Sequence, residues 1–393
     1  MRELNNKALI VITCLLLFAC QSSEPIVEKS TTNQPKLPEV DVSRFETQNV
    51  IDKDALFTLT PQQSTDFLLY FNSAKNSHLS EHERVSNFLQ RKLNSFSFLG
   101  RTYTAKEALL NNEGNCLSLA MLTTALADLV DLDIRFQTVN SSPIYRRYAN
   151  VTTTAGHVRT ILLAKKKTKD EPGTLLRSRM IIDYFPSAGD VKGEFISRDD
   201  FTAMYFQNLA SEALVEENYN LAFSYIQKAL QLNHLNPHSL NTYAVLLNQV
   251  GLSEAAASIY EYGVQFTPRT VNLIWNYANI LKARGEGEKA SSLLADIDAN
   301  KDTNPYSWLD IANEHFQNDN YWLATKYYRK TTKLAPYLHE AYFGLAKVQY
   351  LQGYENKAME SLLKAKDLAY EDETKRLYNA KSATLRLALT QSK

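Results

Sequence analysis

The chain has 393 residues, of which 44% are hydrophobic, and its 43 basic and 43 acidic residues give a formal net charge of zero. That length is enough for two or three domains, and the balanced charge excludes the basic excess that is typical of a nucleic-acid-binding protein. Beyond the first 20 residues the sequence has no stretch apolar enough to cross a membrane.

Residues 1–19 have the layout of a secretory signal peptide. Arg2 and Lys7 precede an apolar run that is too short to span a bilayer. The run ends in "LFAC", which resembles a bacterial lipobox, although Phe18 stands where a small residue is usual. The resemblance implies that the signal is removed before Cys20 and that this cysteine receives lipid.

The residues after the lipobox predict the membrane to which the chain is anchored and a tether that follows the anchor. Gln21, rather than aspartate, follows Cys20, and in lipoproteins of Gram-negative bacteria this favours the periplasmic face of the outer membrane. Residues 20–42 are rich in Ser, Thr, Pro, Gln and Glu, so we expect a flexible tether before the first folded unit. The expected location is the cell envelope, with the membrane contacted through the lipid on Cys20.

Helix signals dominate residues 43–114. Ser80 with Glu83, and Thr104 with Glu107, have the spacing of capping boxes. In a capping box a hydroxyl and a carboxylate satisfy backbone N–H groups at the start of a helix. The sequence therefore predicts helices that begin just after Ser80 and just after Thr104.

Cys116 lies at the start of the next predicted helix, Leu117–Val130, which is almost wholly apolar and is expected to be buried on most sides. Cleavage before Cys20 would remove Cys14 and leave Cys116 as the single thiol of a chain in an oxidising compartment. The first turn of a helix favours a thiolate, because unsatisfied N–H groups and the helix dipole lower the pKa of the thiol. The alternative is that Cys116 is a small core residue.

Three strands are predicted after this helix, in "DIRFQTV" (133–139), "AGHVRTILLAKKK" (155–167) and "SRMIIDYFPSAG" (178–189). The last two form a hairpin, which would place His157 and Asp183 side by side at the ends away from the turn. Taken singly, His157 could be an ordinary strand histidine and Asp183 an ordinary strand end.

Cysteine, histidine and aspartate in this order fit a thiol catalytic triad. Cys116 would be the nucleophile, His157 would take the thiol proton and later protonate the leaving amine, and Asp183 would hold the imidazole tautomer. The polar segment 140–156 is expected to be a loop, either a substrate lid or a plain solvated connection. The other histidines are scattered and the cysteines lack ligand spacing, so we expect neither a metal nor a cofactor.

These stretches resemble the transglutaminase-like, papain-related fold. The resemblance rests on "GNC" at Cys116, "DIRF", "GH" at His157 and "IIDYFP" at Asp183, and it covers residues 104–196. It implies an α+β domain over residues 43–200, with the three residues as nucleophile, base and orienting acid. Animal transglutaminases place a tryptophan beside the nucleophile and this sequence has none there, so the resemblance does not imply protein cross-linking.

From Ala203 the sequence repeats at a constant period, without an insertion, through five blocks that begin at Ala203, Pro237, Val271, Pro305 and His339. Alanine occupies the eighth and twentieth positions of every block: Ala210, Ala244, Ala278, Ala312 and Ala346, then Ala222, Ala256, Ala290, Ala324 and Ala358. This pattern resembles the tetratricopeptide repeat, in which two antiparallel helices pack closely through small residues. It implies an all-α solenoid over residues 203–372, covered by a capping helix over residues 373–393.

In such repeats the first helix of each pair lines a groove, through positions that helical spacing places on a different face from the packed ones. These positions combine amides with aromatic rings, which suits an extended peptide or a partner helix. The predicted partner-binding residues are Asn241, Trp275, Asn279, Tyr306, Asn313, Phe316, Phe343, Lys347 and Tyr350. The alternative is that some of these rings pack between adjacent repeats.

The sequence leaves two main functions open. The first is a lipid-anchored thiol hydrolase or acyltransferase that acts on peptide or amide bonds and whose repeats bind a protein or peptide partner. The second is a non-catalytic adaptor lipoprotein that uses the repeats as an interaction scaffold. Thiol redox sensing is a weaker third function, because the mature chain has no second cysteine to resolve an oxidised Cys116.

Overall fold

The computed structural model describes residues 35–93, 96–97, 101–148, 151–165, 177–184, 190–295, 304–369 and 372–391, and for residues 140–148 and 151–156 this covers the backbone alone. The expected signal peptide, Cys20 and most of the expected tether lie outside the described residues. In the part of the chain that is described, no helix combines the length and the apolar character needed to cross a membrane.

The end of the expected tether packs against the folded part of the chain. Leu37, Val40 and Val42 contact the hydrophobic core, although the sequence predicted a flexible segment as far as residue 42. Phe45 follows and stacks on Phe223, with the ring centroids 4.4 Å apart. The predicted boundary is therefore too late, because a few apolar side chains in a polar segment are enough to anchor it.

Short helices precede the long buried one: η1 (Asp54–Phe57), α1 (Pro61–Phe71), η2 (Ala74–Asn76), α2 (Glu81–Leu93) and α3 (Ala105–Asn111). Thr104 and Glu107 form the predicted capping box of α3. The Ser80 N–H donates to the Glu83 carboxylate at 2.7 Å, as the other predicted box requires. Helix α4 (Cys116–Leu129) follows, and every residue from Cys116 to Ala127 is buried.

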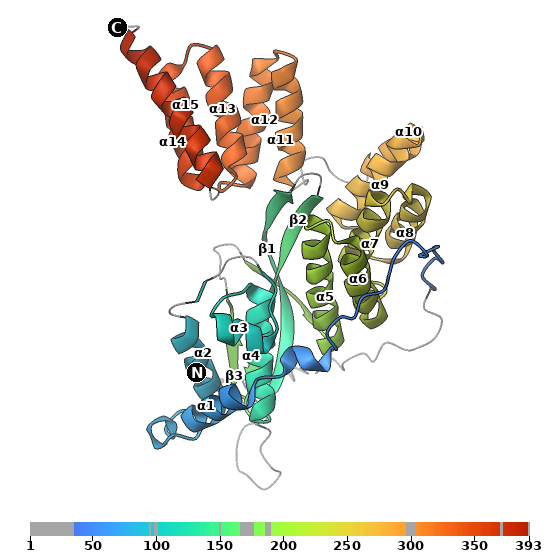
Figure 1. The fold of residues 1–393 in the computed structure, drawn as a ribbon, viewed down its shortest axis with the longest axis vertical. Helices are drawn as coiled ribbons and strands as arrows, with labels where there is room; N and C mark the ends of the chain where they lie inside the picture. The colour runs from blue at the N-terminus through green and yellow to red at the C-terminus, as the bar shows by residue number, and fades with distance from the viewer. Residues whose placement is uncertain are drawn as a thin grey trace, which may run out of the picture. The chain divides into compact units, whose positions relative to one another are not determined.

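The strands form one antiparallel sheet in the order β3-β2-β1-β4: β1 (Asp133–Tyr148), β2 (Val151–Leu163), β3 (Arg179–Ile182) and β4 (Val191–Ile196). Helix α4 packs along the β1–β2 hairpin (Figure 1). Residues 140–148 and 151–156 belong to these two strands and extend the hairpin, so the predicted loop is wrong. Its valine and threonines favour strands, and pairing of the two polar halves outweighs their loop-like composition. The sequence analysis also missed β4.

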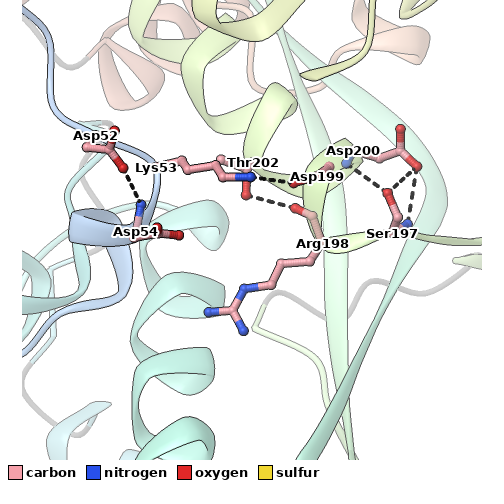
Figure 2. Close-up of polar contacts among 8 residues, drawn as sticks. All are labelled: Asp52, Lys53, Asp54, Ser197, Arg198, Asp199, Asp200 and Thr202. Carbon is pink, nitrogen blue, oxygen red and sulfur yellow. Dashed lines mark hydrogen bonds and ion pairs between the residues drawn. The ribbon is translucent and has the colours of Figure 1, made fainter. Parts of the chain in front are cut away.

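Helix α5 (Arg198–Val215) begins directly after the sheet and is tied to the N-terminal segment. The Ser197 N–H donates to Asp200 Oδ2 at 3.2 Å, and the Asp200 N–H donates to Ser197 Oγ at 3.0 Å (Figure 2). The Lys53 ammonium lies 3.4 Å from the Asp199 carboxylate in the same view. The cap fixes where α5 starts, while the exposed ion pair adds little stability.

The repeat region consists of helix pairs of the tetratricopeptide type: α5 with α6 (Tyr219–Leu232), α7 (Pro237–Gln249) with α8 (Ser253–Phe266), α9 (Val271–Ala283) with α10 (Gly287–Ala295), α11 (Pro305–Gln317) with α12 (Tyr321–Leu334), and α13 (His339–Leu351) with α14 (Glu355–Leu368). The ten repeated alanines are all buried, because the paired helices approach closely at these positions. The turn inside each pair holds one residue with positive φ, at the same position of every block: Glu217, Gly251, Gly285, Asp319 and Gly353.

The buried apolar residues of the described chain form one large cluster and three small ones. The large cluster runs from Phe45 through α4 and the sheet to Ile280 on α9. Separate clusters lie in α9–α10, in α11–α13 and in α13–α15. Helix α15 (Asp372–Gln391) stands where the capping helix was expected and contributes Tyr378 and Leu385 to the last cluster. The hydrophobic core therefore does not divide at residue 200.

Candidate functional site

The residues around Cys116 fix the start of α4. Asn115 Oδ1 accepts from the Ser118 N–H at 3.0 Å, which caps the helix. Gly114 has a φ of 150°, and a Cβ at this position would lie 2.6 Å from Ser118 Cβ. Glycine is therefore needed for this close approach, and the "GNC" sequence sets where the thiol lies.

Burial raises the pKa of the Cys116 thiol to about 11. Loss of hydration is the largest cause, and the Asp183 carboxylate raises the pKa further. The backbone N–H groups of Val158, Leu117 and Cys116 itself act in the opposite direction and lower the pKa. The predicted lowering of this pKa is wrong in sign, because desolvation of a side chain that is 8% exposed outweighs the helix start. At neutral pH the resting group is a neutral thiol.

His157 on β2 and Asp183 directly after β3 are in contact, as the predicted hairpin required. His157 Nε2 lies 2.7 Å from Asp183 Oδ1, and the two side chains are 8% and 19% exposed. The carboxylate orients the imidazole through Nε2, so a proton exchanged with a thiol would be carried by Nδ1.

Three elements bring the three predicted residues to one place. The backbone N–H of Val158, the residue after His157, lowers the pKa of the Cys116 thiol, and the Asp183 charge raises the pKa of the same group. A thiol, an imidazole and a carboxylate are the groups that nucleophilic thiol catalysis uses.

Tyr184 is a positioning residue that the sequence analysis missed. Its hydroxyl lies 2.6 Å from Thr123 Oγ1 on α4 and 2.7 Å from Thr160 Oγ1 on β2. Burial raises the pKa of Tyr184, so the hydroxyl stays protonated and can donate. These bonds fix the residue next to Asp183. The aromatic in "IIDYFP" was the available signal, but its partners could be identified only from the packing of α4 on the sheet.

Asp190, just before β4, brings a second carboxylate to the site. His157, Asp183 and Asp190 each offer a ligand atom within 4.8 Å of the other two, so they could hold a divalent cation. The 2.7 Å between His157 Nε2 and Asp183 Oδ1 is a hydrogen-bond distance, shorter than the spacing of two ligands that lie about 2 Å from one tetrahedral ion. The contact is therefore better explained by a shared proton. The sequence analysis missed Asp190.

Three of the nine predicted partner-binding residues make contacts within the repeat region. Tyr306 is 4% exposed and belongs to the core of α11–α13, so its assignment to the groove is wrong. Asn241 Oδ1 accepts from Asn276 at 2.8 Å, which links two neighbouring pairs. Asn313 Oδ1 accepts from the Tyr328 hydroxyl at 2.7 Å. In both asparagines the amide oxygen is therefore used by a contact within the region.

The other six lie wholly or partly at the surface: Trp275, Asn279, Phe316, Phe343, Lys347 and Tyr350. Phe343, Lys347 and Tyr350 share one face of α13 and line a pocket of about 320 Å³. The Lys347 ammonium also lies 4.5 Å from the centre of the Phe316 ring, which joins α13 to α11. This part of the predicted surface is hollowed and accessible.

No family model matches the sequence, and no curated protein matches it significantly. Solved structures match half of the chain or slightly less. They include pilF of Pseudomonas aeruginosa (15% identity, 50% of this chain and 93% of that chain, TM-score 0.35) and yeast Tom70 (18%, 48% and 40%, TM-score 0.40). Another is YrrB, described as a tetratricopeptide-repeat protein with an unusual peptide-binding site (16%, 47% and 94%, TM-score 0.26). At these identities the similarity concerns the fold alone.

Proposed function

We propose that the repeat region is an interaction scaffold that binds a peptide or protein partner through the first helices of its pairs. The observation that carries this proposal is the surface of α13, where Phe343, Lys347 and Tyr350 line a pocket. Tyr350 is 50% exposed, and rings beside a hollow supply much of the binding energy in recognition sites. Asn279, exposed on α9, supplies an amide that can bond the backbone of a peptide.

The test is cross-linking of the full chain to its partner in cells, with Tyr350→Ala and Asn279→Ala compared with the control Trp322→Ala. Trp322 is 70% exposed and lies on α12, the second helix of a pair. We expect Tyr350→Ala and Asn279→Ala to lose most of the cross-linked partner and Trp322→Ala to keep it. Loss in Trp322→Ala alone would place binding on the second helices and overturn the proposal.

As a second function, we propose thiol-dependent acyl transfer in the sheet domain, by which we mean the helices and strands from η1 to β4 (residues 54–196). We take this domain to be transglutaminase-like. The support is the placement of Cys116 against the His157–Val158 backbone, together with the 2.7 Å contact between His157 and Asp183. A buried thiol beside an oriented imidazole is the arrangement that nucleophilic catalysis needs.

In this mechanism His157 acts as a general base at the moment of attack, because the raised pKa of Cys116 disfavours a resting thiolate. The sulfur bonds to the carbonyl carbon of an amide while Nδ1 takes the thiol proton. The imidazolium then gives that proton to the departing amine as the C–N bond breaks, and a thioester remains. Water or an acceptor amine attacks the thioester and restores the thiol.

Acylation of Cys116 by p-nitrophenyl acetate, located by peptide mass spectrometry, tests this second function. We expect His157→Gln to slow acylation about 100-fold and Cys116→Ala to abolish it. His234→Gln, a partly buried histidine of the repeat region, should acylate like the wild type. Equal rates in the wild type and His157→Gln would mean that the thiol reacts without its base. The protein would then be a non-catalytic adaptor.

We further propose that lipid on Cys20 anchors the chain in the cell envelope, on the periplasmic face of the outer membrane. The support is the sequence before and after Cys20, with its apolar run and the following Gln21. Metabolic labelling with a palmitate analogue should mark the wild type and leave Cys20→Ser unlabelled. Labelling of Cys20→Ser would contradict the anchor, and recovery in inner-membrane fractions would contradict the location.

A further inference from the structure

A pocket between α13, α14 and α15 is lined mainly by apolar side chains. Ala346, Leu362 and Leu385 are buried residues of its lining, and Phe343 and Tyr350 add two aromatic rings. Its volume of about 320 Å³ is at the lower end of the range for ligand sites, about 300–1,000 Å³. It therefore has room for one or two apolar side chains of a bound peptide.

Lys347 and Lys381 bring two positive charges to this pocket, one from α13 and one from α15. The Lys347 ammonium lies 5.3 Å from the centre of the Phe343 ring, and the Lys381 ammonium lies 5.9 Å from the same point. Partial burial lowers the pKa of Lys347, and the charge of Lys381 lowers it further. Neither lysine belongs to an ion pair among the described residues. The Lys381 charge repels that of Lys347, and an anion that pairs with both lysines would relieve this cost.

We propose that this pocket binds a carboxylate that neighbours an apolar side chain in a peptide of a protein partner. The carboxylate pairs with Lys347 and Lys381, and the apolar side chain fills the space beside Leu362 and Leu385. Charge complementarity selects the acidic group, and the apolar lining supplies burial. This assignment rests on the proposed scaffold function and specifies the chemistry of its partner.

Fluorescence polarisation of the full chain with three labelled peptides tests the chemistry. The first peptide alternates Leu and Glu and ends in an amide, the second replaces every Glu with Gln, and the third is the Gln peptide with a terminal carboxylate. We expect the first or the third to bind about tenfold more tightly than the second, and the better of the two identifies a side-chain or a terminal carboxylate as the ligand. Equal affinity for all three would overturn the proposal.

Substitutions of the lysines test whether the carboxylate binds in this pocket. Lys347→Met and Lys381→Met should each remove the preference for the acidic peptide, whereas Lys347→Arg should keep it. The matched control is Lys357→Met, because Lys357 on α14 also places its ammonium near an aromatic ring, 5.1 Å from the centre of the Tyr354 ring, and does not line the pocket. An equal loss in Lys357→Met would show a general effect of surface charge and overturn the proposal.

The two proposals can fail separately. If partner cross-linking is lost in Tyr350→Ala but unchanged in Lys347→Met and Lys381→Met, the scaffold function stands and the acidic ligand is wrong. If cross-linking survives Tyr350→Ala and Asn279→Ala as well, both proposals are wrong. Thermal melts of each variant that match the wild type would show that loss of binding is not loss of folding.

Discussion

The sheet domain and the later helix pairs bury their side chains by different means. In the sheet domain, α4 is covered by segments that are distant in sequence, such as Val85 on α2 and Val158 on β2. In α11–α14, each helix packs mainly with its sequence neighbours, through alanines that recur at fixed positions of every block. A substitution in α4 should therefore affect many elements, and one in the later pairs should stay local.

The first helix pairs, like the sheet domain, pack against segments that are distant in the sequence. Phe136 on β1 stacks on Phe201 of α5, with the ring centroids 4.3 Å apart. The Thr102 N–H donates to Glu212 Oε1 of α5 at 3.0 Å. The large core continues from the sheet into α5–α9. The limits of a sequence repeat and the limits of a cooperative unit therefore need not coincide.

Leu126→Ala should have the largest effect on stability and tests whether the two regions unfold separately. Leu126 on α4 is fully buried, and its truncation should lower the free energy of unfolding by about 3 kcal/mol through lost burial and the cavity left behind. We expect hydrogen exchange to quicken in α4, β2 and α5–α8 while α13 and α14 stay protected. The control Leu362→Ala on α14 should give the opposite pattern. A uniform increase in exchange would mean that the chain unfolds as one unit.

Gly344→Ala tests whether packing in the later pairs is local. A Cβ on Gly344 of α13 would lie 2.3 Å from the ring of Tyr328, which is fully buried and cannot move aside. We expect a loss of about 2 kcal/mol, confined to α11–α14 in hydrogen exchange. Gly287→Ala, where a Cβ meets nothing within 4 Å, should instead stabilise α10 slightly. Faster exchange in α4 of Gly344→Ala would contradict the separation of the two regions.

The repeats could be predicted from the sequence because their geometry is local and occurs five times. A small residue at a fixed position of every block indicates a close helix crossing, and the ten alanines are buried as expected. Their binding surface was harder to predict, since position alone does not reveal that Tyr306 packs inside or that Asn313 bonds Tyr328. Those outcomes depend on which neighbour fills each gap.

The order of the three candidate residues along the chain could be predicted from the sequence, but the pKa of Cys116 could not. The pairing of β2 with β3 brings His157 and Asp183 together, and sequence can suggest it because the two strands are consecutive in the chain. The position of Asp190 depends on the pairing of β4 with β1, two strands that are distant in the sequence. The pKa of Cys116 depends on desolvation, and its sign could be read only from how closely α4 is covered.

Alkaline pH should destabilise the sheet domain through Cys116. The folded thiol has a pKa of about 11 against an ordinary value of 9.0, so above pH 9 the unfolded chain loses a proton that the folded chain keeps. The stabilisation is fully present below pH 9 and is lost as pH rises through 11. Between pH 8 and pH 11 the wild type should lose about 2 kcal/mol more than Cys116→Ala in urea unfolding. Tyrosines ionise in both proteins and cancel, so parallel curves would show that the thiol is not desolvated.

Glu217→Gly gives the smallest expected effect and tests how uniform the repeats are. The turn position has positive φ in all five pairs, but Glu217 and Asp319 occupy it where the other pairs have glycine. A side chain is strained in this conformation, so Glu217→Gly should stabilise the first pair by about 0.5 kcal/mol after the greater flexibility of unfolded glycine is counted. Gly251→Ala, at the equivalent turn with φ of 81°, should cost about 1 kcal/mol. Thermal melts can measure both. If Glu217→Gly stabilises the protein and Gly251→Ala destabilises it, the backbone geometry of the turn controls stability in the same way in both pairs. If both substitutions destabilise the protein, contacts of the first pair with the sheet domain outweigh the effect of the turn at Glu217.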